Sequence, residues 1–333
     1  MISVGLIGCG NWGPHLLRNL AQSQVFALKG VADHHAERLR AASRAFPNLA
    51  THDDAASLIA RADIDAVVIA TPASTHYELT RAALQAGKHV LVEKPLSTKA
   101  DEAETLVELA RRMGQVLMVD HTTLFTGSGR EILDMQSGGG LGQVTHYDAV
   151  RANLGRFLPD VNVLWDLGPH DFSLIDALFA DEPDSVEAIG TAHLEPQRHD
   201  LVHVTLRYPA GRIAHVHLSW ISPARLRRTV IGTSDKVLFW DDLADDGKLK
   251  VYPYGIAPMS AIDGLPALPA LRVGECREPA LAKTEPLARV IQHFANVISG
   301  TEAPIADGLR GLRVVRLLER AQAALDRVSH PAS

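Results

Sequence analysis

The first third of the chain alternates short apolar runs with stretches of helical periodicity. The apolar runs are typical of strands buried on both faces of a parallel sheet. Five such runs occur, at Ile2–Ile7, Val25–Ala32, Asp65–Ala70, His89–Val92 and Val116–Val119. The clearest helical stretches between them are Ala36–Ala45, Thr75–Ala86 and Ala100–Met113. Strand–helix alternation at this spacing predicts a doubly wound α/β sheet, because right-handed crossovers leave few other topologies.

Beyond residue 120 the pattern changes to strands joined by turns. Asn162–Phe179 has a helical pattern that Gly168-Pro169 is expected to interrupt, and Pro209–Gly211 is a hairpin signature. The strand candidates are Val144–Val150, Val186–Ala192, Leu201–Tyr208, Arg212–Trp220, Leu226–Ile231, Lys236–Trp240 and Lys248–Tyr252. Residues 253–283 are interpreted as a long surface segment, and amphipathic helices are expected at Pro286–Ser299 and Asp307–Val328.

These patterns predict two domains. Residues 1–121 form an N-terminal Rossmann-type domain, and residues 122–333 form an α+β domain with a large, mostly antiparallel open sheet. The second domain is assigned to substrate binding and oligomerisation, and the helix at 307–328 is a candidate for packing back on the first domain. The open face of the second sheet needs a cover, so we expect a homodimer or homotetramer.

Composition narrows the functional class. The 333 residues include 33 Lys+Arg against 39 Asp+Glu and are 46% hydrophobic, which excludes wholesale disorder. The acidic balance and the lack of a long basic run argue against nucleic-acid or membrane-surface partners. No apolar segment reaches the ~18 residues of a transmembrane helix. Two cysteines do not make a disulfide framework, and the first residues lack a signal-peptide pattern, so a cytoplasmic location is expected.

A glycine turn follows the first strand. The sequence Gly8-Cys9-Gly10-Asn11-Trp12-Gly13 opens a helix, and Asp33 ends the second strand about 20 positions later. Gly8 permits the tight turn, Gly10 lets a pyrophosphate approach the backbone, and Gly13 lets the helix pack closely. In this context the pattern predicts a dinucleotide site.

Asp33 bears on which dinucleotide is bound. A carboxylate at this position accepts hydrogen bonds from an adenosine ribose and repels a 2′-phosphate, so NAD is favoured over NADP. His34 and His35, when protonated, would partly offset that repulsion.

Two further groups carry candidate chemistry. Lys94 stands at the carboxyl end of a buried strand, where ligands bind in open α/β sheets, although a surface ion pair with Glu93 is an equal alternative. Asp166 and His170 are four residues apart, so on a helix they share a face, and a carboxylate beside an imidazole suits a general base. Taken alone, such a pair is more often solvated than catalytic.

These features together resemble the glucose–fructose oxidoreductase / inositol dehydrogenase (Gfo/Idh/MocA) family of sugar dehydrogenases. The resemblance rests on G-C-G-N-W-G at 8–13, A-T-P-A-S-T-H at 70–76, E-K-P at 93–95 and W-D-L-G-P-H-D at 165–171. It implies that Lys94, Asp166 and His170 are the catalytic group, and that a cis bond precedes Pro95. The cofactor-binding set that we expect is Gly8, Gly10, Asn11, Trp12, Gly13, Asp33, Thr71, Pro72, His76, Glu93, Lys94 and His121.

A narrower likeness is to a branch that acts on nucleotide sugars and aminoglycosides, commonly at the sugar 3-position. Residues 151–156, 160–166 and the C-terminal tail carry it. The branch usually has Gly-His-Thr where this chain has Asp120-His121-Thr122. The extra carboxylate is either a contact for a cationic substrate or a packing variant, and we favour packing.

The resulting hypothesis is an NAD-dependent dehydrogenase that oxidises a secondary hydroxyl, at carbon 3, of a sugar, sugar nucleotide or aminoglycoside. Either His170 or Lys94 is the base, and the other stabilises the alkoxide. The substrate-binding candidates are Lys94, Asn153, Asn162, Trp165, Asp166 and His170, with Arg151 and Arg156 as a further pair. The alternatives are an NADPH-dependent 3-ketosugar reductase and a non-catalytic NAD-binding sensor or scaffold.

Other polar clusters receive structural interpretations. His203, His215 and His217 are expected to be sheet histidines, and no metal site is predicted. Arg225, Arg227 and Arg228 would suit a diphosphate if the substrate were a nucleotide sugar, but a solvated strand edge is favoured.

Overall fold

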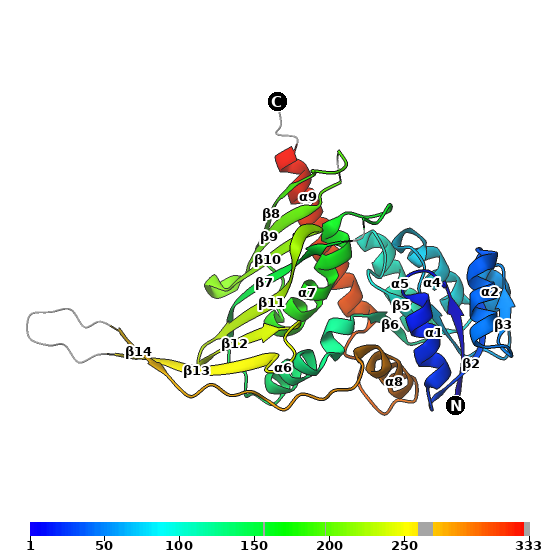
Figure 1. Cartoon of the computed structure of the whole chain (residues 1–333), viewed down its shortest axis with the longest axis horizontal. Coiled ribbons are helices and arrows are strands. Elements are labelled where there is room, and N and C mark those ends of the chain that lie inside the picture. Colours follow the sequence, from blue (N-terminus) through cyan, green and yellow to red (C-terminus); the bar gives the residue numbers. More distant parts are fainter. Residues whose placement is uncertain (156, 197, 259–268, 330–333) are drawn as a thin grey trace, which may run out of the picture. The chain divides into compact units, whose positions relative to one another are not determined.

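The computed structural model describes residues 1–155, 157–196, 198–258 and 269–329 (Figure 1). They form two compact units, each built from segments that are separate in the sequence. Unit 1 comprises Met1–Thr126, Pro159–Val161 and Thr284–Glu319, and unit 2 comprises Gly127–Leu158, Asn162–Lys283 and Arg320–Ser333. The sequence suggested one boundary, after residue 121, whereas the structure returns residues 284–319 to the N-terminal unit.

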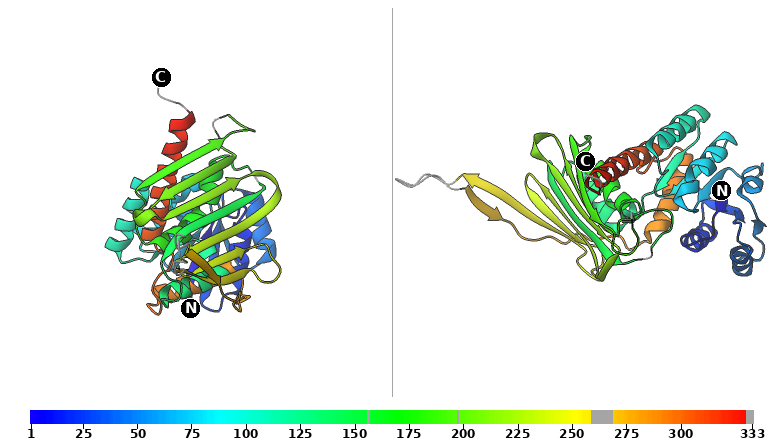
Figure 2. Two further views of the ribbon diagram at one scale, coloured as in Figure 1. Left: turned by 90° about the vertical axis from the view of Figure 1, so that its left-hand side faces the viewer. Right: turned by 90° about the horizontal axis from the view of Figure 1, so that it is seen from above.

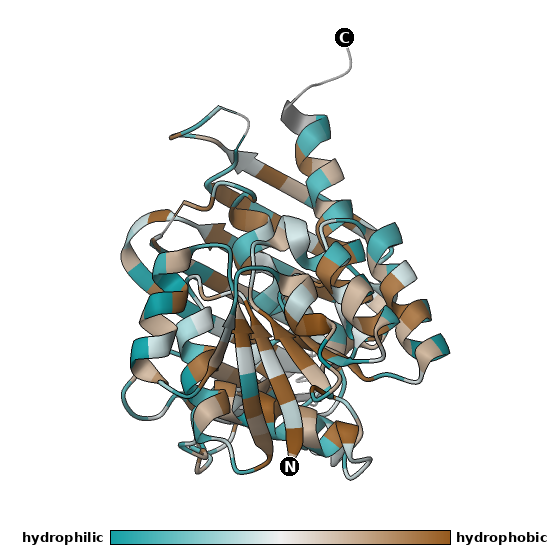
Figure 3. Ribbon diagram, turned by 90° about the vertical axis from the view of Figure 1, so that its right-hand side faces the viewer, coloured by the Kyte–Doolittle hydropathy of each residue, from teal (hydrophilic) through white to brown (hydrophobic). Residues whose placement is uncertain are grey.

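Unit 1 contains a six-stranded sheet in the order β3-β2-β1-β4-β5-β6, with every strand pair parallel. The strands are β1 (Ile2–Ile7), β2 (Phe26–Ala32), β3 (Ala50–His52), β4 (Ala66–Ile69), β5 (His89–Glu93) and β6 (Leu117–Asp120). Apolar residues run along the central strands (Figure 3). The doubly wound sheet is therefore confirmed. The edge strand β3 escaped prediction because its three residues have no apolar run.

The helices of unit 1 follow the strands in alternation. They are α1 (Gly13–Gln22), α2 (Ala36–Ala45), α3 (Ala55–Ile59), α4 (His76–Gln85), α5 (Ala100–Met113) and α8 (Pro286–Ile298), with 3-10 turns η1 (Ala73–Thr75) and η2 (Thr122–Phe125). The α5 helix has the predicted bounds. It ends where Gly114 takes a left-handed conformation, φ 67°, which glycine adopts without strain.

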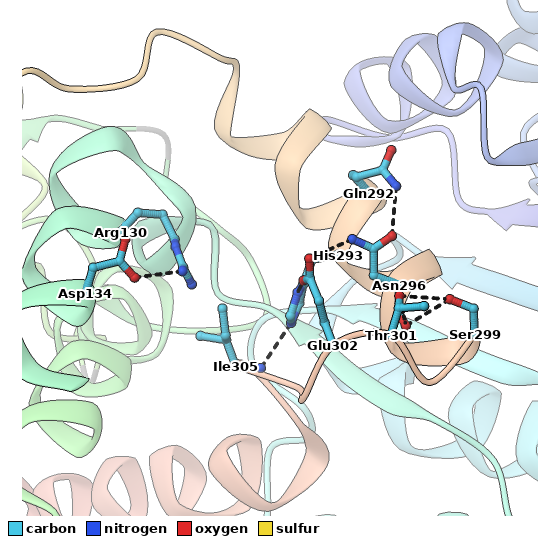
Figure 4. Close-up of polar contacts among 9 residues, drawn as sticks. All are labelled: Arg130, Asp134, Gln292, His293, Asn296, Ser299, Thr301, Glu302 and Ile305. Atoms are coloured by element: carbon cyan, nitrogen blue, oxygen red, sulfur yellow. Dashed lines mark hydrogen bonds and ion pairs between the residues drawn. The ribbon is translucent and has the colours of Figure 1, made fainter. Parts of the chain in front are cut away.

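A buried histidine holds α8 to the segment that follows it (Figure 4). His293 is 5% exposed, and its Nδ1 lies 2.6 Å from Glu302 Oε2. The Ile305 amide donates to His293 Nε2 at 3.1 Å, which assigns the ring proton to Nδ1. On the same helix Phe294 stacks on Phe26 of β2, at 5.8 Å between ring centroids. The residues that precede the last helix, α9 (Gly308–Ser329), thus belong to the core of unit 1.

Unit 2 contains an eight-stranded mixed sheet in the order β14-β13-β12-β11-β7-β10-β9-β8. Its strands are β7 (Val144–Leu154), β8 (Ser185–Thr191), β9 (Leu201–Arg207), β10 (Ile213–Ser219), β11 (Ile221–Thr233), β12 (Lys236–Asp241), β13 (Leu249–Pro258) and β14 (Pro269–Val273). All pairs are antiparallel except β7 with β10. The mostly antiparallel sheet is confirmed, as is the β9–β10 hairpin, whose turn is η3 (Pro209–Gly211).

The interval 253–283 contains the pairing of β13 with β14, which was not expected, whereas its residues 273–283 are mostly exposed, as expected of a surface segment. Residues 259–268 of this interval lie outside the described residues. One expectation for this unit is wrong: helix α7 (Val163–Phe179) continues without a break through Gly168 and Pro169. Proline removes one helical hydrogen bond, but both residues are buried, so packing on either side of them outweighs that loss.

The two faces of the large sheet differ. Helix α7 packs against β7, β9 and β10 from one side. Figure 2 shows the strands from the other side, with α7 behind them, and no described helix of unit 2 covers that face. The unit also has α6 (Gly127–Ser137), which lies against α7 and carries an Arg130–Asp134 ion pair of 2.9 Å (Figure 4). Within the described part of the chain, no helix has the length and apolarity needed to span a membrane.

Candidate active site

The glycine turn has the geometry of a phosphate cradle. Gly8 has φ 98°, and a Cβ there would lie 2.5 Å from the Ala70 carbonyl oxygen. A Cβ at Gly13 would lie 2.4 Å from the Gly8 carbonyl oxygen, so both positions require glycine. A Cβ at Gly10 would meet only an Arg38 nitrogen, at 3.8 Å. The space beside Gly10 is therefore open to a ligand that approaches the backbone.

The N-terminus of α1 adds donors to this cradle. Trp12 is the N-cap residue and makes no side-chain cap hydrogen bond, and Pro14 occupies the first turn. The amides of the first helical turn are thus not capped by the N-cap side chain, and the helix dipole favours an anion at this end. Asn11 and Trp12 are exposed beside the turn.

Asp33, the predicted ribose contact, is held in place by backbone amides. It is 7% exposed, accepts from the Cys9 and His35 amides at 2.8 Å each, and lies 3.4 Å from Arg38. Burial alone would raise the pKa of Asp33, but the His35 and Cys9 amides and the Arg38 charge lower it below its usual value. The carboxylate is therefore ionised. Next to it a pocket of 370 Å³ is lined by His34, His35, Ala36, Glu37 and Arg38.

The carboxyl ends of β5 and β6 bring two acids together. Glu93 and Asp120 are cross-strand partners, 8% and 2% exposed, and the Lys94 charge acts on both. Burial raises the pKa of Asp120 to about 6, and burial together with the Asp120 charge raises the pKa of Glu93 well above its usual value. The peptide bond between Lys94 and Pro95 is cis, as expected.

His76 connects the loop after β4 to this turn. It is 1% exposed, with Nδ1 2.7 Å from the Pro95 carbonyl oxygen and Nε2 2.9 Å from that of Thr71. Burial lowers the pKa of His76, although the hydrogen bonds to the two carbonyl groups act to raise it. Pro72 is exposed beside the same loop. His76 therefore fixes the backbone positions of two segments that the sequence assigned to the cofactor site.

His121 offers an unused imidazole at the end of β6. It is 1% exposed, and within the described part of the chain neither ring nitrogen has a hydrogen-bond partner. Burial, with the charges of Arg310 and Lys94, lowers its pKa to about 3, so the ring is neutral. A buried imidazole without partners suits a site that a ligand completes. Together, the open glycine turn, the ionised Asp33 and the buried imidazole of His121 fit a nicotinamide dinucleotide.

In unit 2, Asn162 and Trp165 have structural contacts. Asn162 is the N-cap of α7, and its Oδ1 accepts from the Leu164 and Trp165 amides at 3.1 and 3.3 Å. Its Nδ2 donates to Gln322 Oε1 at 2.8 Å, and the Trp165 indole donates to the same oxygen at 3.3 Å. Both the oxygen and the nitrogen of the Asn162 side-chain amide therefore have protein partners. The sugar contacts expected of Asn162 and Trp165 stay predictions.

The acidic residues of α7 tie the helix to the sheet. Asp166 Oδ2 accepts from the Trp220 indole at 3.0 Å, and His170 stands one turn further on the same face. Asp171, 1% exposed, accepts from the Tyr147 hydroxyl and from Arg151 Nε, both at 2.9 Å. Asp171 belongs to the motif at 165–171, but no role was expected for it. An acid beside apolar helix positions was the signal that it needs a buried partner.

The predicted site residues thus form two groups. Unit 1 holds Lys94 with the cofactor-binding residues, and unit 2 holds Asp166, His170 and Asn153. The convergence of these groups on one substrate stays a prediction, and Arg156 lies outside the described residues. On β9 and β10 the rings of His203 and His217 stack at 4.3 Å. No group of three metal-binding side chains occurs within the described ranges.

A parallel sheet with a pyrophosphate cradle, followed by an α+β unit, defines the class of nicotinamide-dependent dehydrogenases. Comparison with known proteins agrees with that class. Residues 2–121 match the family model "Oxidoreductase family, NAD-binding Rossmann fold", and residues 130–237 match "GFO/IDH/MocA C-terminal domain".

Individual relatives support the same assignment. The UDP-N-acetylglucosamine 3-dehydrogenase of Acidithiobacillus ferrooxidans is 30% identical over 97% of this chain and 96% of its own. A structure of that enzyme covers 98% of this chain and 97% of its own with a TM-score of 0.82, at 28% identity. A dTDP-3,4-didehydro-2,6-dideoxy-alpha-D-glucose 3-reductase of Streptomyces violaceoruber is 30% identical over 54% of this chain and 55% of its own. The chain belongs to the Gfo/Idh/MocA family. It is a sugar oxidoreductase with a nicotinamide cofactor.

Proposed function

We propose that the protein oxidises the hydroxyl at carbon 3 of a nucleotide-linked sugar to a ketone, with NAD as the oxidant. The observation that carries this proposal is the end-to-end similarity to a UDP-N-acetylglucosamine 3-dehydrogenase, over 97% of this chain. The ionised Asp33 supports NAD, because a carboxylate at the ribose repels a 2′-phosphate.

The residues would divide the work as follows. The glycine turn and Asp33 would hold NAD, which would supply the acceptor for the hydride that leaves the carbinol carbon. His170 takes the hydroxyl proton, and Asp166 supports the imidazole from the same helix face. Lys94 donates a hydrogen bond to the substrate oxygen and stabilises the negative charge that develops there. The reaction also balances if Lys94 takes the hydroxyl proton and His170 donates the hydrogen bond to the substrate oxygen.

A spectrophotometric assay of NAD reduction tests this proposal. The panel contains UDP-N-acetylglucosamine, dTDP-glucose, free N-acetylglucosamine, myo-inositol and an aminoglycoside. We expect the fastest reduction with a nucleotide sugar. Tight NAD binding without reduction by any member of the panel would favour a non-catalytic sensor.

The same site in the reverse direction is the second candidate. Arg38 beside Asp33 supplies positive charge that would accept a 2′-phosphate, and one relative is named as a 3-reductase. Dissociation constants for NADPH and NADH separate the candidates. An NADPH affinity above that for NADH supports the reductase.

We also propose self-association through the open face of the unit 2 sheet. Cross-strand pairing places Val150, Val230 and Phe239 on this face, and Ile189 of β8, 59% exposed, lies on it too. Such a face is stabilised when a second copy removes it from water. A homodimer or homotetramer is the expected state.

A further inference from the structure

Two arginines stand opposite each other in the unit 2 sheet. Arg151 of β7 and Arg227 of β11 are cross-strand partners. They point to the same face as the neighbouring Tyr147, whose hydroxyl bonds Asp171 of α7. Like charges at directly opposed positions destabilise a sheet. This arrangement therefore needs negative charge from elsewhere.

The carboxylates within the described part of unit 2 neutralise the pair unequally. Arg151 donates from Nε to Asp171 at 2.9 Å, and the two side chains are 11% and 2% exposed. Where the chain is described, the ion pair of Arg227 is longer, 3.5 Å from its Nη1 to Asp242, and its side chain is 34% exposed. The Nε of Arg227 is buried without a hydrogen-bond partner among the described residues.

The electrostatic environment of Arg227 is correspondingly unfavourable. Burial lowers the pKa of Arg227, the Arg151 charge lowers it further, and the nearby Arg225 acts in the same direction. Asp242 is the opposing group. Asp171 is already paired with Arg151, so Asp242, at 3.5 Å, is the carboxylate that opposes the Arg151 and Arg225 charges at Arg227, and positive charge is in excess there.

The position of β11 removes the simplest explanation. A solvated strand edge was expected for Arg225, Arg227 and Arg228. Arg225 and Arg228 are exposed, as that expectation requires, but Arg227 is half-buried, and its strand β11 lies between β12 and β7 inside the sheet. The three residues also do not act together. Arg228 projects to the opposite face, where it bonds Asp241 at 2.8 Å.

The arginine pair lies beside the predicted catalytic helix. Asp171, which holds Arg151, directly follows His170 on α7. Asn153, a candidate sugar contact, lies two residues after Arg151 on β7 and so points to the same face. The excess cation is therefore within the same unit as the predicted base and on the same side of its sheet.

From this arrangement we infer that Arg227, with Arg151 behind it, binds the diphosphate of a nucleotide-linked substrate whose sugar lies toward His170. The inference rests on the proposed function, which it deepens by assigning a subsite to the nucleotide end. A guanidinium matches phosphate oxygens with parallel hydrogen bonds, and such an acceptor would satisfy the buried Nε of Arg227. A neutral free sugar would leave this group unsatisfied.

The experiment compares Arg227→Ala with Arg228→Ala, a neighbouring variant with the same change in charge on the other face of the sheet. Isothermal titration measures UDP binding to the full-length protein saturated with NAD, so that the adenosine site is already filled. We expect Arg227→Ala to weaken UDP binding roughly 10- to 100-fold and Arg228→Ala to leave it within about twofold. Arg227→Lys keeps the positive charge but loses the parallel hydrogen bonds of the guanidinium, so its UDP affinity should lie between those of the two alanine variants.

Two further ligands identify the anion. Glucuronate tests a sugar carboxylate in place of the diphosphate, and N-acetylglucosamine tests the neutral ring. Equal UDP affinity in the Arg227 and Arg228 variants overturns the inference, as does undetectable UDP binding to the wild type or a loss of glucuronate binding alone. If the circular dichroism of Arg227→Ala shows that this variant is misfolded, Arg227→Lys is used instead. An affinity of Arg227→Lys for UDP equal to that of the wild type would contradict the inference.

The outcome is separate from that of the proposed function. UDP binding that depends on Arg227, without turnover of any sugar, supports the subsite and refutes the dehydrogenase. Turnover of a nucleotide sugar at wild-type rates in Arg227→Ala, with UDP affinity unchanged, supports the dehydrogenase and refutes the subsite.

Discussion

At the residue scale, the carboxyl pair of Glu93 and Asp120 is the least expected feature of unit 1. Two buried acids in cross-strand register cost free energy when both are ionised, although the Lys94 charge offsets part of that cost. Thr122 also donates to Asp120 at 3.0 Å, which stabilises the ionised form. The pair therefore retains a proton to higher pH than a free carboxyl group would.

Asp120 should make stability depend on pH. Its pKa is raised from 3.8 to about 6 on folding, so the folded protein holds more protons than the unfolded chain in this interval, and stability falls as pH rises through it. We expect the free energy of unfolding of the wild type, relative to Asp120→Asn, to fall by roughly 1–3 kcal/mol between about pH 4 and pH 7. Urea denaturation measures this difference. A flat or rising difference contradicts the account, and the exposed Asp101→Asn serves as control.

Lys94 and His170 are the residues expected to act on the substrate. Lys94→Ala and His170→Ala should each lower kcat roughly 10²–10⁴-fold and leave the NAD dissociation constant nearly unchanged, because each group acts on the substrate. Lys99→Ala, five residues further on and paired with Glu102, is the control for Lys94. Steady-state rates with fluorescence titration of NAD give both constants. Wild-type turnover in either variant removes that residue from the mechanism.

At the scale of elements, α7 carries most of the unit 2 chemistry, and its N-terminus is fixed by Asn162. Loss of this cap in Asn162→Ala should lower the free energy of unfolding by about 0.5–2 kcal/mol, measured by urea denaturation. Asn162→Ser keeps a capping oxygen and should lose less. If Asn162 contacts the sugar instead, both variants will raise KM by similar factors while their stabilities differ.

The same helix shows where prediction from sequence succeeded. The apolar periodicity of 163–179 and the acid–histidine spacing were enough to place Asp166 and His170 on one helix. The break expected at Pro169 did not occur, because burial of the surrounding helix outweighs one missing hydrogen bond. Local rules describe only the cost of that bond, whereas the compensating packing comes from distant strands.

Other features could not be predicted from the sequence, because they depend on contacts between residues far apart in the chain. The excess charge at Arg227 follows from its register with Arg151, 76 positions earlier in the numbering, and Asp171 gains its role only through Tyr147 and Arg151. The short strand β3 has no periodicity to detect. In contrast, the tight turn at Gly8 and the close packing at Gly13 were predicted correctly, since both depend on local backbone conformation, whereas the ribose contact of Asp33 stays a prediction.

At the scale of the whole molecule, the open sheet face predicts an oligomer. Val230→Glu would place a charge at its centre and should shift the protein toward a monomer, because burying an unpaired carboxylate is costly. Analytical ultracentrifugation at micromolar concentration measures the shift. Leu309→Glu, at a position 46% exposed on α9, is the control. A monomeric wild type contradicts the proposed assembly.

The proposed dehydrogenase takes the hydrogen from carbon 3 of a sugar and passes it to the nicotinamide. An isotope experiment with the nucleotide sugar that turns over fastest, deuterated at carbon 3, and unlabelled NAD follows the label by mass spectrometry. We expect one deuterium in the reduced cofactor and a ketone at carbon 3 of the product. Reduced cofactor without deuterium, or a product oxidised at another carbon, would contradict the proposed reaction.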